Sequence, residues 1–331
     1  MPTLSAITDA GPVPVGPALS VFDHAFIGID EFGQPVDLQL IYKNVMIGGE
    51  PGAGKSSLLN TVVAHAALSP DCRLCLFDGK QVEMGLWADC ADVFVGPDLP
   101  HAIRTLVRLQ KVMDNRYTYL RAHRRRKITR TDEFRPILVA IDELAIFSAT
   151  LLDKKVQEQF SVLLRDIVAR GRAVGIIVAA ATQRPSSDII PTSLRDLFAW
   201  RFAGRCTTDS SSDIVLGHGW AQRGWSANTI ASTNPGCGLL IAEGGTPKLV
   251  KAAWLSDQDI IRIAGYAAAI RRVTGTGGDG PALPGDAGVR EPRHPLPSAP
   301  AGTASASIPA DDSVRPLTVH GNALAPKESA A

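Results

Sequence analysis

Short apolar runs alternate along the chain with longer segments in which apolar residues recur at helical spacing. The helical segments cover residues 55–68, 101–125 and 155–170. Runs of strand length lie at residues 26–30, 32–38, 45–47, 73–78, 92–96, 136–141, 175–181 and 198–203. Two further runs, 238–242 and 249–253, predict a hairpin closed across residues 243–247. This alternation predicts an α/β domain with a mainly parallel sheet flanked by helices.

The two ends of the chain differ in composition from its middle. Residues 1–23 are rich in proline, glycine and small residues, which predicts a flexible N-terminal arm. Residues 273–331 consist largely of proline, alanine, glycine and serine and contain no aromatic residue. Such a segment cannot bury enough apolar surface to offset the entropy lost on ordering, so we expect a disordered tail. The folded domain is therefore expected to span residues 24–272.

Charge, cysteine content and hydropathy argue against three classes of protein: a strongly basic nucleic-acid binder, a disulfide-bonded fold and a membrane-spanning protein. Lysine and arginine number 34 against 33 acids, a net charge of +1, so a nucleic-acid contact would have to come from local clustering. The five cysteines are irregularly spaced and are interpreted as small buried hydrophobes. No apolar run approaches the length that a bilayer requires, and no signal sequence is evident. The expected location is the cytoplasm, with the inner face of the membrane as an alternative.

Residues 49–56 fit the phosphate-binding pattern G-x-x-x-x-G-K-[ST]. The motif follows a strand-like run and begins a helical segment, which is the context that this loop requires. Lys55 is expected to reach the β and γ phosphates of ATP, and Ser56 to offer its hydroxyl to Mg²⁺. A glycine-rich turn before an ordinary helix is the alternative. The expected nucleotide-binding residues are Gly49, Glu50, Pro51, Gly52, Ala53, Gly54, Lys55, Ser56 and Ser57.

Polar residues follow three later strand-like runs, where open α/β sheets bind their ligands. Asp142 and Glu143 end the apolar run 136–141, so Asp142 is expected to support Mg²⁺ and Glu143 to take a proton from the attacking water. The alternative is that the two acids cap the next helix. Gln183 is a candidate for contacting the γ phosphate or orienting water. Asp78 is either a neighbour of the site or part of an Asp-Gly turn.

The helical segment predicted at residues 101–125 becomes basic toward its end, and the basic run continues beyond it. This basic segment could be a solvated face, a patch that follows DNA phosphates, or an attachment to an anionic membrane. The basic run begins at Arg116 in this interpretation. Its candidate DNA contacts are Arg121, Arg124, Arg125, Arg126 and Lys127.

Several motifs follow one another along the chain. They are Gly28-Ile29-Asp30 with Gly33-Gln34-Pro35-Val36, the phosphate-binding loop, Asp78-Gly79-Lys80 with Val82-Glu83, Met113-Asp114-Asn115-Arg116-Tyr117, Ile141-Asp142-Glu143, Arg170-Gly171-Arg172-Ala173-Val174-Gly175-Ile176 and Ala181-Thr182-Gln183-Arg184-Pro185. Together these motifs resemble the motor domain of the FtsK/SpoIIIE DNA translocases, most closely the small plasmid-transfer (Tra) proteins of actinobacterial conjugative elements. The resemblance implies a RecA-like (ASCE) P-loop NTPase fold, ATP hydrolysis with Mg²⁺, assembly into a hexameric ring and double-stranded DNA as the partner. It also implies that Gln183 senses the γ phosphate and that Arg172 enters the site of a neighbouring subunit.

The sequence therefore favours an ATP-dependent translocase of double-stranded DNA that serves conjugative transfer or chromosome partition. Two alternatives use the same fold. The first is a secretion-type ATPase that moves proteins. The second is a nucleotide-gated scaffold that recruits a membrane-embedded transfer protein and hydrolyses little ATP.

Overall fold

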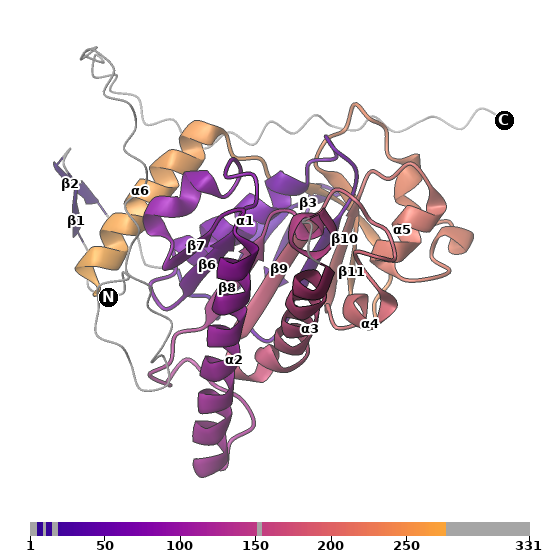
Figure 1. Ribbon diagram of the computed structural model, residues 1–331. Helices are drawn as coiled ribbons and strands as arrows, with labels where there is room; N and C mark the ends of the chain where they lie inside the picture. The colour runs from indigo at the N-terminus through magenta and orange to yellow at the C-terminus, as the bar shows by residue number, and fades with distance from the viewer. Residues whose placement is uncertain (1–4, 9–10, 15–18, 151–153, 276–331) are drawn as a thin grey trace. The chain divides into compact units, whose positions relative to one another are not determined.

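The computed structural model describes residues 5–8, 11–14, 19–150 and 154–275 (Figure 1). Most of the predicted tail, from residue 276 onward, lies outside the described residues. Within the described part of the chain, no helix is both long enough and apolar enough to cross a membrane.

A ten-stranded sheet forms the centre of the domain, in the order β4-β3-β12-β11-β10-β5-β9-β8-β6-β7. The six strands from β10 to β7 are parallel to one another, and the other four strands pair antiparallel, beginning with β11 beside β10. The predicted parallel α/β architecture and the closing hairpin are both confirmed. The strands are β3 (His24–Asp30), β4 (Pro35–Gln39), β5 (Val45–Gly48), β6 (Arg73–Phe77), β7 (Val93–Val95), β8 (Ile137–Ile141), β9 (Ile176–Thr182), β10 (Trp200–Gly204), β11 (Cys237–Ala242) and β12 (Lys248–Ala252).

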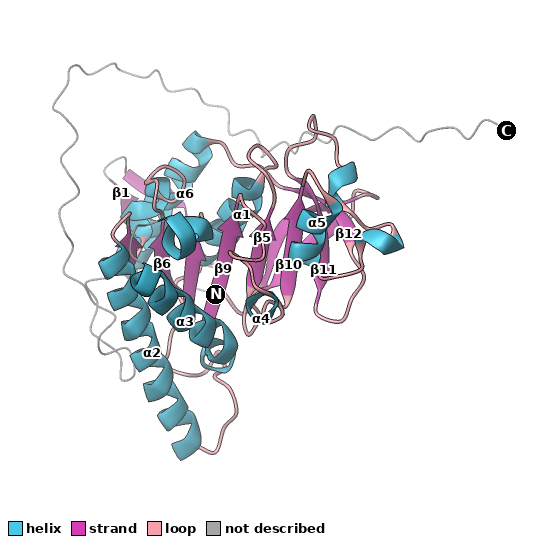
Figure 2. Ribbon diagram, turned by 45° about the vertical axis from the view of Figure 1, so that its right-hand side comes forward, coloured by secondary structure: helices cyan, strands magenta, loops and turns pink. Residues whose placement is uncertain are grey.

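Helices cover both faces of the sheet (Figure 2). One face packs on α1 and α6, and the other on α2, α3, α4 and α5. Helices α1, α2 and α3 confirm the three predicted helical segments, although α2 ends three residues before the predicted position, and α6 was not predicted. The helices are α1 (Lys55–Ala67), η1 (Gly85–Cys90), α2 (Leu99–Ala122), η2 (Ile146–Thr150), α3 (Lys154–Arg170), η3 (Gly171–Val174), α4 (Thr192–Arg195), α5 (Asp209–Leu216), η4 (Ala221–Arg223), η5 (Ala227–Thr229) and α6 (Asp257–Val273).

The central strands are buried on both faces, because successive side chains point to opposite sides of a sheet. Strand β8 illustrates this: Val139 packs in the core under α2 and α3, and Leu138 packs in the core under α1 and α6. This burial explains why β8 and β9 are continuous apolar runs in the sequence. The polar side chains next to these strands therefore lie at the two edges of the sheet where the strands begin and end.

The N-terminal arm predicted for residues 1–23 needs correction. Strands β1 (Ser5–Thr8) and β2 (Gly11–Pro14) pair antiparallel, and the arm's last residues are fixed to the domain. The hydroxyl of Ser20 donates to the Asp71 carboxylate at 2.5 Å, and the N–H of the buried Val21 donates to the same carboxylate at 3.1 Å. Asp71 supplies these acceptors from the turn after α1, which the local composition of the arm could not indicate.

Helix α6 extends the predicted domain boundary by one residue and is fixed at both ends. Its N-terminus has a capping box between Ser256 and Asp259. Near its C-terminus the buried Arg271 donates to the carbonyls of Ala66 and Ala67 at the end of α1, and pairs with the buried Asp92 at 3.3 Å. These contacts join the last helix to the helix that follows the phosphate-binding loop.

Candidate nucleotide-binding site

The phosphate-binding loop connects β5 to α1 and is shaped by main-chain contacts. The N–H of Ala53 donates to the Glu50 carbonyl at 3.1 Å, and the N–H of Gly236 donates to the Ala53 carbonyl at 2.9 Å. Gly54 has a φ of +83°, and a Cβ atom at this position would lie 2.1 Å from the nitrogen of Gly236. Only glycine fits here, because the turn is left-handed and the chain behind it is in contact.

Helix α1 begins directly after this turn and has no side chain capping its N-terminus. Its first N–H groups are therefore available to an external acceptor, and the helix dipole favours an anion there. This is the arrangement of a phosphate-binding helix.

Lys55 is the buried cation of the loop. Its ammonium group donates to the Glu50 carbonyl at 2.7 Å. Burial lowers its pKa to about 8, and the nearby carboxylates of Glu143 and Asp142 oppose this shift. A desolvated ammonium group with a single main-chain acceptor gains strongly from a phosphate oxygen.

Asp142 follows β8 and carries an unsatisfied carboxylate oxygen. Its Oδ2 atom is buried and has no hydrogen-bond partner among the described residues. Burial, with the carboxylates of Asp78 and Glu83, raises the pKa of Asp142 to about 7. A buried carboxylate oxygen without a donor suits a hard cation such as Mg²⁺, and the hydroxyl of Ser56, in the first turn of α1, would offer a second oxygen at the same edge. The residues present therefore fit the magnesium ion that the loop implies.

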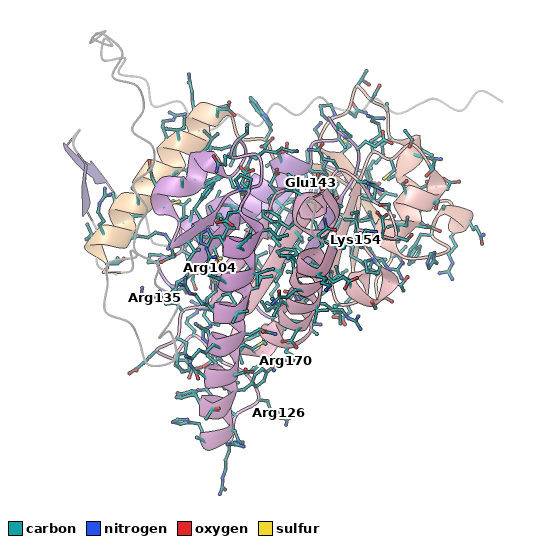
Figure 3. All side chains as sticks on the ribbon, viewed as in Figure 1. Arg104, Arg126, Arg135, Glu143, Lys154 and Arg170 are labelled. Atoms are coloured by element: carbon teal, nitrogen blue, oxygen red, sulfur yellow. The ribbon has the colours of Figure 1, made fainter. Side chains whose placement is uncertain are left out.

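Glu143 is held in one orientation by the end of β9. One of its carboxylate oxygens accepts the hydroxyl of Thr182 at 2.7 Å, and the other accepts the N–H of Gln183 at 2.8 Å. It is labelled in Figure 3, where it lies near the upper end of the sheet. A fixed carboxylate next to the phosphate-binding loop is suited to accept a proton from a bound water.

Asp78 has a different role from the candidate ligands. Its buried carboxylate accepts three main-chain N–H groups, from Lys80 at 2.9 Å, Gln81 at 2.8 Å and Met84 at 2.8 Å. It therefore builds the turn after β6, which is the second of the two interpretations. Its charge still reaches the site, because it contributes to the raised pKa of Asp142.

Arg205 and Thr182 belong to the site although the sequence analysis gave neither of them a role; Thr182 was quoted only as part of a motif, and Arg205 stood in none. Arg205 follows β10, and its guanidinium contacts the Glu50 carboxylate at 3.0 Å. Thr182 is the last residue of β9 and orients Glu143, as described above. Both stand at the carboxyl ends of strands beside the loop strand β5, and that position is the sequence signal that could have pointed to them.

Arg172 lies at the opposite edge of the sheet, before β9 begins. Its Nε donates to the Tyr42 carbonyl at 2.7 Å, and its terminal nitrogen contacts the Glu243 carboxylate at 3.2 Å. The structure thus brings Lys55, Asp142 and Glu143 together at one edge and leaves Arg172 at the other.

The basic segment after α2 also lies at the edge of Arg172. The main chain of Ile128 bonds to Ala173 at 3.0 Å, and Lys127 lies 4.4 Å above the Tyr42 ring. Figure 3 shows Arg126 near the lower end of α2, well separated from Glu143.

The candidate DNA contacts in this segment are not equivalent. Arg121, Arg124 and Arg126 are exposed and form no ion pair with any residue that the structure describes. The guanidinium of Arg125 is instead paired with Asp132. Arg116, the predicted start of the basic run, is fully buried and donates to the carbonyls of Val174 and Arg135, so that part of the interpretation was wrong.

Sequence comparison supports the resemblance that the motifs predicted. Residues 20–136 match the family model described as the FtsK/SpoIIIE family. A DNA translocase FtsK of Staphylococcus epidermidis is 26% identical over 262 residues, covering 72% of this chain and 31% of that protein. A DNA translocase FtsK of Helicobacter pylori is 28% identical over 231 residues, covering 65% of this chain and 26% of that protein. The chain thus spans about a third or less of the length of these curated relatives.

Solved structures share the fold at low sequence identity. The conjugation coupling protein TcpA of pCW3, solved with ATPγS, has a TM-score of 0.63 and 19% identity, covering 79% of this chain and 77% of that chain. The cytoplasmic domain of the Thermomonospora curvata type VII secretion ATPase EccC has a TM-score of 0.59 and 21% identity, covering 77% of this chain and 32% of that chain. The resemblance predicted from the motifs and the P-loop ATPase fold are therefore confirmed.

Proposed function

We propose that this chain, an FtsK/SpoIIIE-type P-loop ATPase, is an ATP-driven motor that moves double-stranded DNA. The observation that carries the proposal is the joined cluster of Lys55, Asp142 and Glu143 at one edge of the sheet, in a chain whose curated relatives are DNA translocases. The role that we favour is conjugative transfer, with chromosome partition as the alternative.

The residues of this edge divide the work of ATP hydrolysis. The loop N–H groups and Lys55 bind the β and γ phosphates, and Asp142 with Ser56 would hold Mg²⁺. The ion, when bound, neutralises charge that develops on the phosphate oxygens. As a water oxygen attacks the γ phosphorus, Glu143 accepts its proton and the bond to the departing ADP oxygen breaks. We propose that Gln183, whose main-chain N–H donates to Glu143, contacts the γ phosphate or that water through its side chain.

A complete site on this proposal needs a second subunit. Arg172 stands at the edge opposite to its own loop, so we propose that it acts on the nucleotide of a neighbouring copy, in a closed ring of identical subunits. An arginine supplied in this way stabilises the charge of the transition state. We propose that the exposed arginines near Arg172 contact the phosphates of the duplex.

The test is an ATPase titration with duplex DNA, at low salt and at protein concentrations that favour assembly. We expect duplex DNA to raise turnover and Glu143→Gln to abolish the rise while ATP still binds. An ATPase rate that stays unchanged on adding duplex DNA would contradict translocation of DNA. A secretion-type ATPase would be insensitive to DNA but not to its protein substrate, and a scaffold would hydrolyse slowly under every condition.

A further inference from the structure

The phosphate-binding loop carries an acidic side chain of its own. Glu50 occupies the second position of the motif, next to Gly49, in a loop whose N–H groups and lysine attract anions. An unpaired carboxylate here would repel a bound triphosphate. In the structure this carboxylate is paired with Arg205.

Arg205 holds Glu50 through both the main chain and the side chain. The Glu50 N–H donates to the Arg205 carbonyl at 2.9 Å, and the Arg205 guanidinium contacts the Glu50 carboxylate at 3.0 Å. The side chain of Arg205 is 27% exposed and that of Glu50 is 19% exposed, so water screens the charges of this pair only in part. Sheet register fixes the partners, because Ala203 of β10 lies opposite Gly48 of β5 and each chain then continues by two residues to the pair.

Lys55 is bound to the same residue. Its ammonium group donates to the Glu50 carbonyl at 2.7 Å, so the cation lies beside the residue that carries the carboxylate. In the structure the carboxylate itself is paired with Arg205. A direct Glu50–Lys55 ion pair would occupy the cation that the phosphates require.

We propose that Arg205 is a positioning residue that withholds the Glu50 carboxylate from Lys55, and that this pair sets the affinity of the loop for triphosphate nucleotides. The inference rests on the proposed function only in that the loop binds ATP. Its distinctive consequence is that the harm done by losing Arg205 comes from Glu50. Replacing Glu50 as well should therefore restore the affinity for the nucleotide.

The experiment is a double-mutant cycle on nucleotide binding, measured by calorimetry with ATPγS and with ADP in the presence of Mg²⁺ and without DNA. For Arg205→Ala we expect ATPγS affinity to fall about tenfold or more, and ADP affinity to fall less because ADP carries less charge. The double variant Glu50→Gln/Arg205→Ala is expected to recover most of the loss. Glu50→Gln alone, which leaves Arg205 beside a neutral loop, should bind ATPγS severalfold more tightly.

Two results would overturn the inference. If the double variant binds ATPγS as weakly as Arg205→Ala, Arg205 contacts the phosphates directly. If Arg205→Ala binds as the wild type does, the pair has no role in binding. Steady-state turnover gives a second readout. Arg205→Ala should raise the KM for ATP with little change in kcat, whereas Arg205→Lys, which keeps the positive charge, should leave KM near the wild-type value.

Folding and the proposed function are controlled separately. Thermal unfolding of each variant shows whether it is folded, and Glu50→Gln/Arg205→Gln, which keeps a neutral hydrogen-bonding pair, replaces the double variant if Arg205→Ala does not fold. Wild-type protein that fails to bind ATPγS would contradict the proposed function. Normal wild-type binding without the rescue would contradict this inference alone.

Discussion

The two edges of the parallel sheet differ in how their polar groups are satisfied. At the carboxyl edge, β9 and β10 orient Glu143 and Glu50 through Thr182 and Arg205, so contacts within the chain organise the site. At the opposite edge, Arg172 donates to the main chain of Tyr42 and pairs with Glu243, and Arg121, Arg124 and Arg126 are exposed. The carboxyl edge is thus preorganised, whereas the opposite edge presents three arginines that form no ion pair with any described residue.

The length of β9 shows how far apart the two edges lie. Strand β9 separates Arg172 from Gln183 and has seven residues, which span about 20 Å in an extended strand. Arg172 therefore cannot reach the loop of its own chain without unfolding the strand. We propose that the edge that binds a nucleotide and the edge that carries Arg172 meet between different molecules. The predictions below test that division, beginning with the largest expected effect.

Replacing Arg172 tests the second edge most directly. We expect Arg172→Ala to lower DNA-stimulated turnover by about three orders of magnitude or more, while ATP binding is retained, because on our proposal the arginine acts on a neighbour's nucleotide. Mixing the variant into wild-type protein should inhibit turnover by more than dilution alone. Arg170→Ala is the matched control, since Arg170 lies two residues away and pairs with Asp166 and Asp114 of its own chain. Equal losses in both variants would assign a structural role to Arg172.

Replacing Glu143 tests the first edge. Glu143→Gln should bind ATP with near-normal affinity and lower turnover by about two to four orders of magnitude, because the amide cannot accept the proton of the attacking water. Thr182→Val should give a smaller loss, since it removes one of the bonds that orient the carboxylate. Single-turnover hydrolysis separates this step from product release. Unchanged hydrolysis by Glu143→Gln would remove Glu143 from the role of base.

The buried Lys55 predicts a pH dependence of nucleotide binding. Its pKa is lowered from 10.5 to about 8, so in the free protein its charge is present at pH 7 and is lost as the pH rises through about 8. Phosphates favour the charged form, so binding above pH 8 should take up a proton, and affinity should fall by up to about tenfold per pH unit. Calorimetry in two buffers with different ionisation enthalpies measures the uptake. Absence of proton uptake at pH 9 would contradict this account of Lys55.

The basic segment predicts the smallest effects. Replacing Arg121, Arg124 and Arg126 together by alanine should weaken duplex binding and lower the slope of log K against log salt by about one for each phosphate that is no longer neutralised. Arg125→Ala should change the salt slope less, because its guanidinium is already paired with Asp132. DNA binding measured across a range of salt concentrations checks both. Equal slopes for wild type and triple variant would place the DNA-binding surface elsewhere.

The parts of the site that the sequence revealed are those that depend on local order. The glycine-rich loop between a strand and a helix, and acids directly after a buried strand, are recognisable because parallel strands end at a common edge. Lys55, Asp142 and Glu143 could be joined by that argument alone. The predicted α/β alternation also supplied α1, α2, α3 and the closing hairpin in their order, but not α6.

The parts that the sequence could not reveal depend on which strands become neighbours. Arg205 follows Glu50 by 155 residues, and they meet because β10 pairs with β5 in a particular register. Arg116 and Arg126 look alike in the chain, yet one is buried against η3 and the other is exposed. Asp71 fixes the end of the N-terminal arm from a distant turn.

By itself, then, the sequence determined that the chain binds a nucleotide through an α/β sheet, since loop chemistry and apolar periodicity are local properties. The tertiary structure decided which edge each charge occupies, which charges are paired and which remain exposed. The physical reason is that pairing and burial depend on contacts between segments that the chain order leaves far apart.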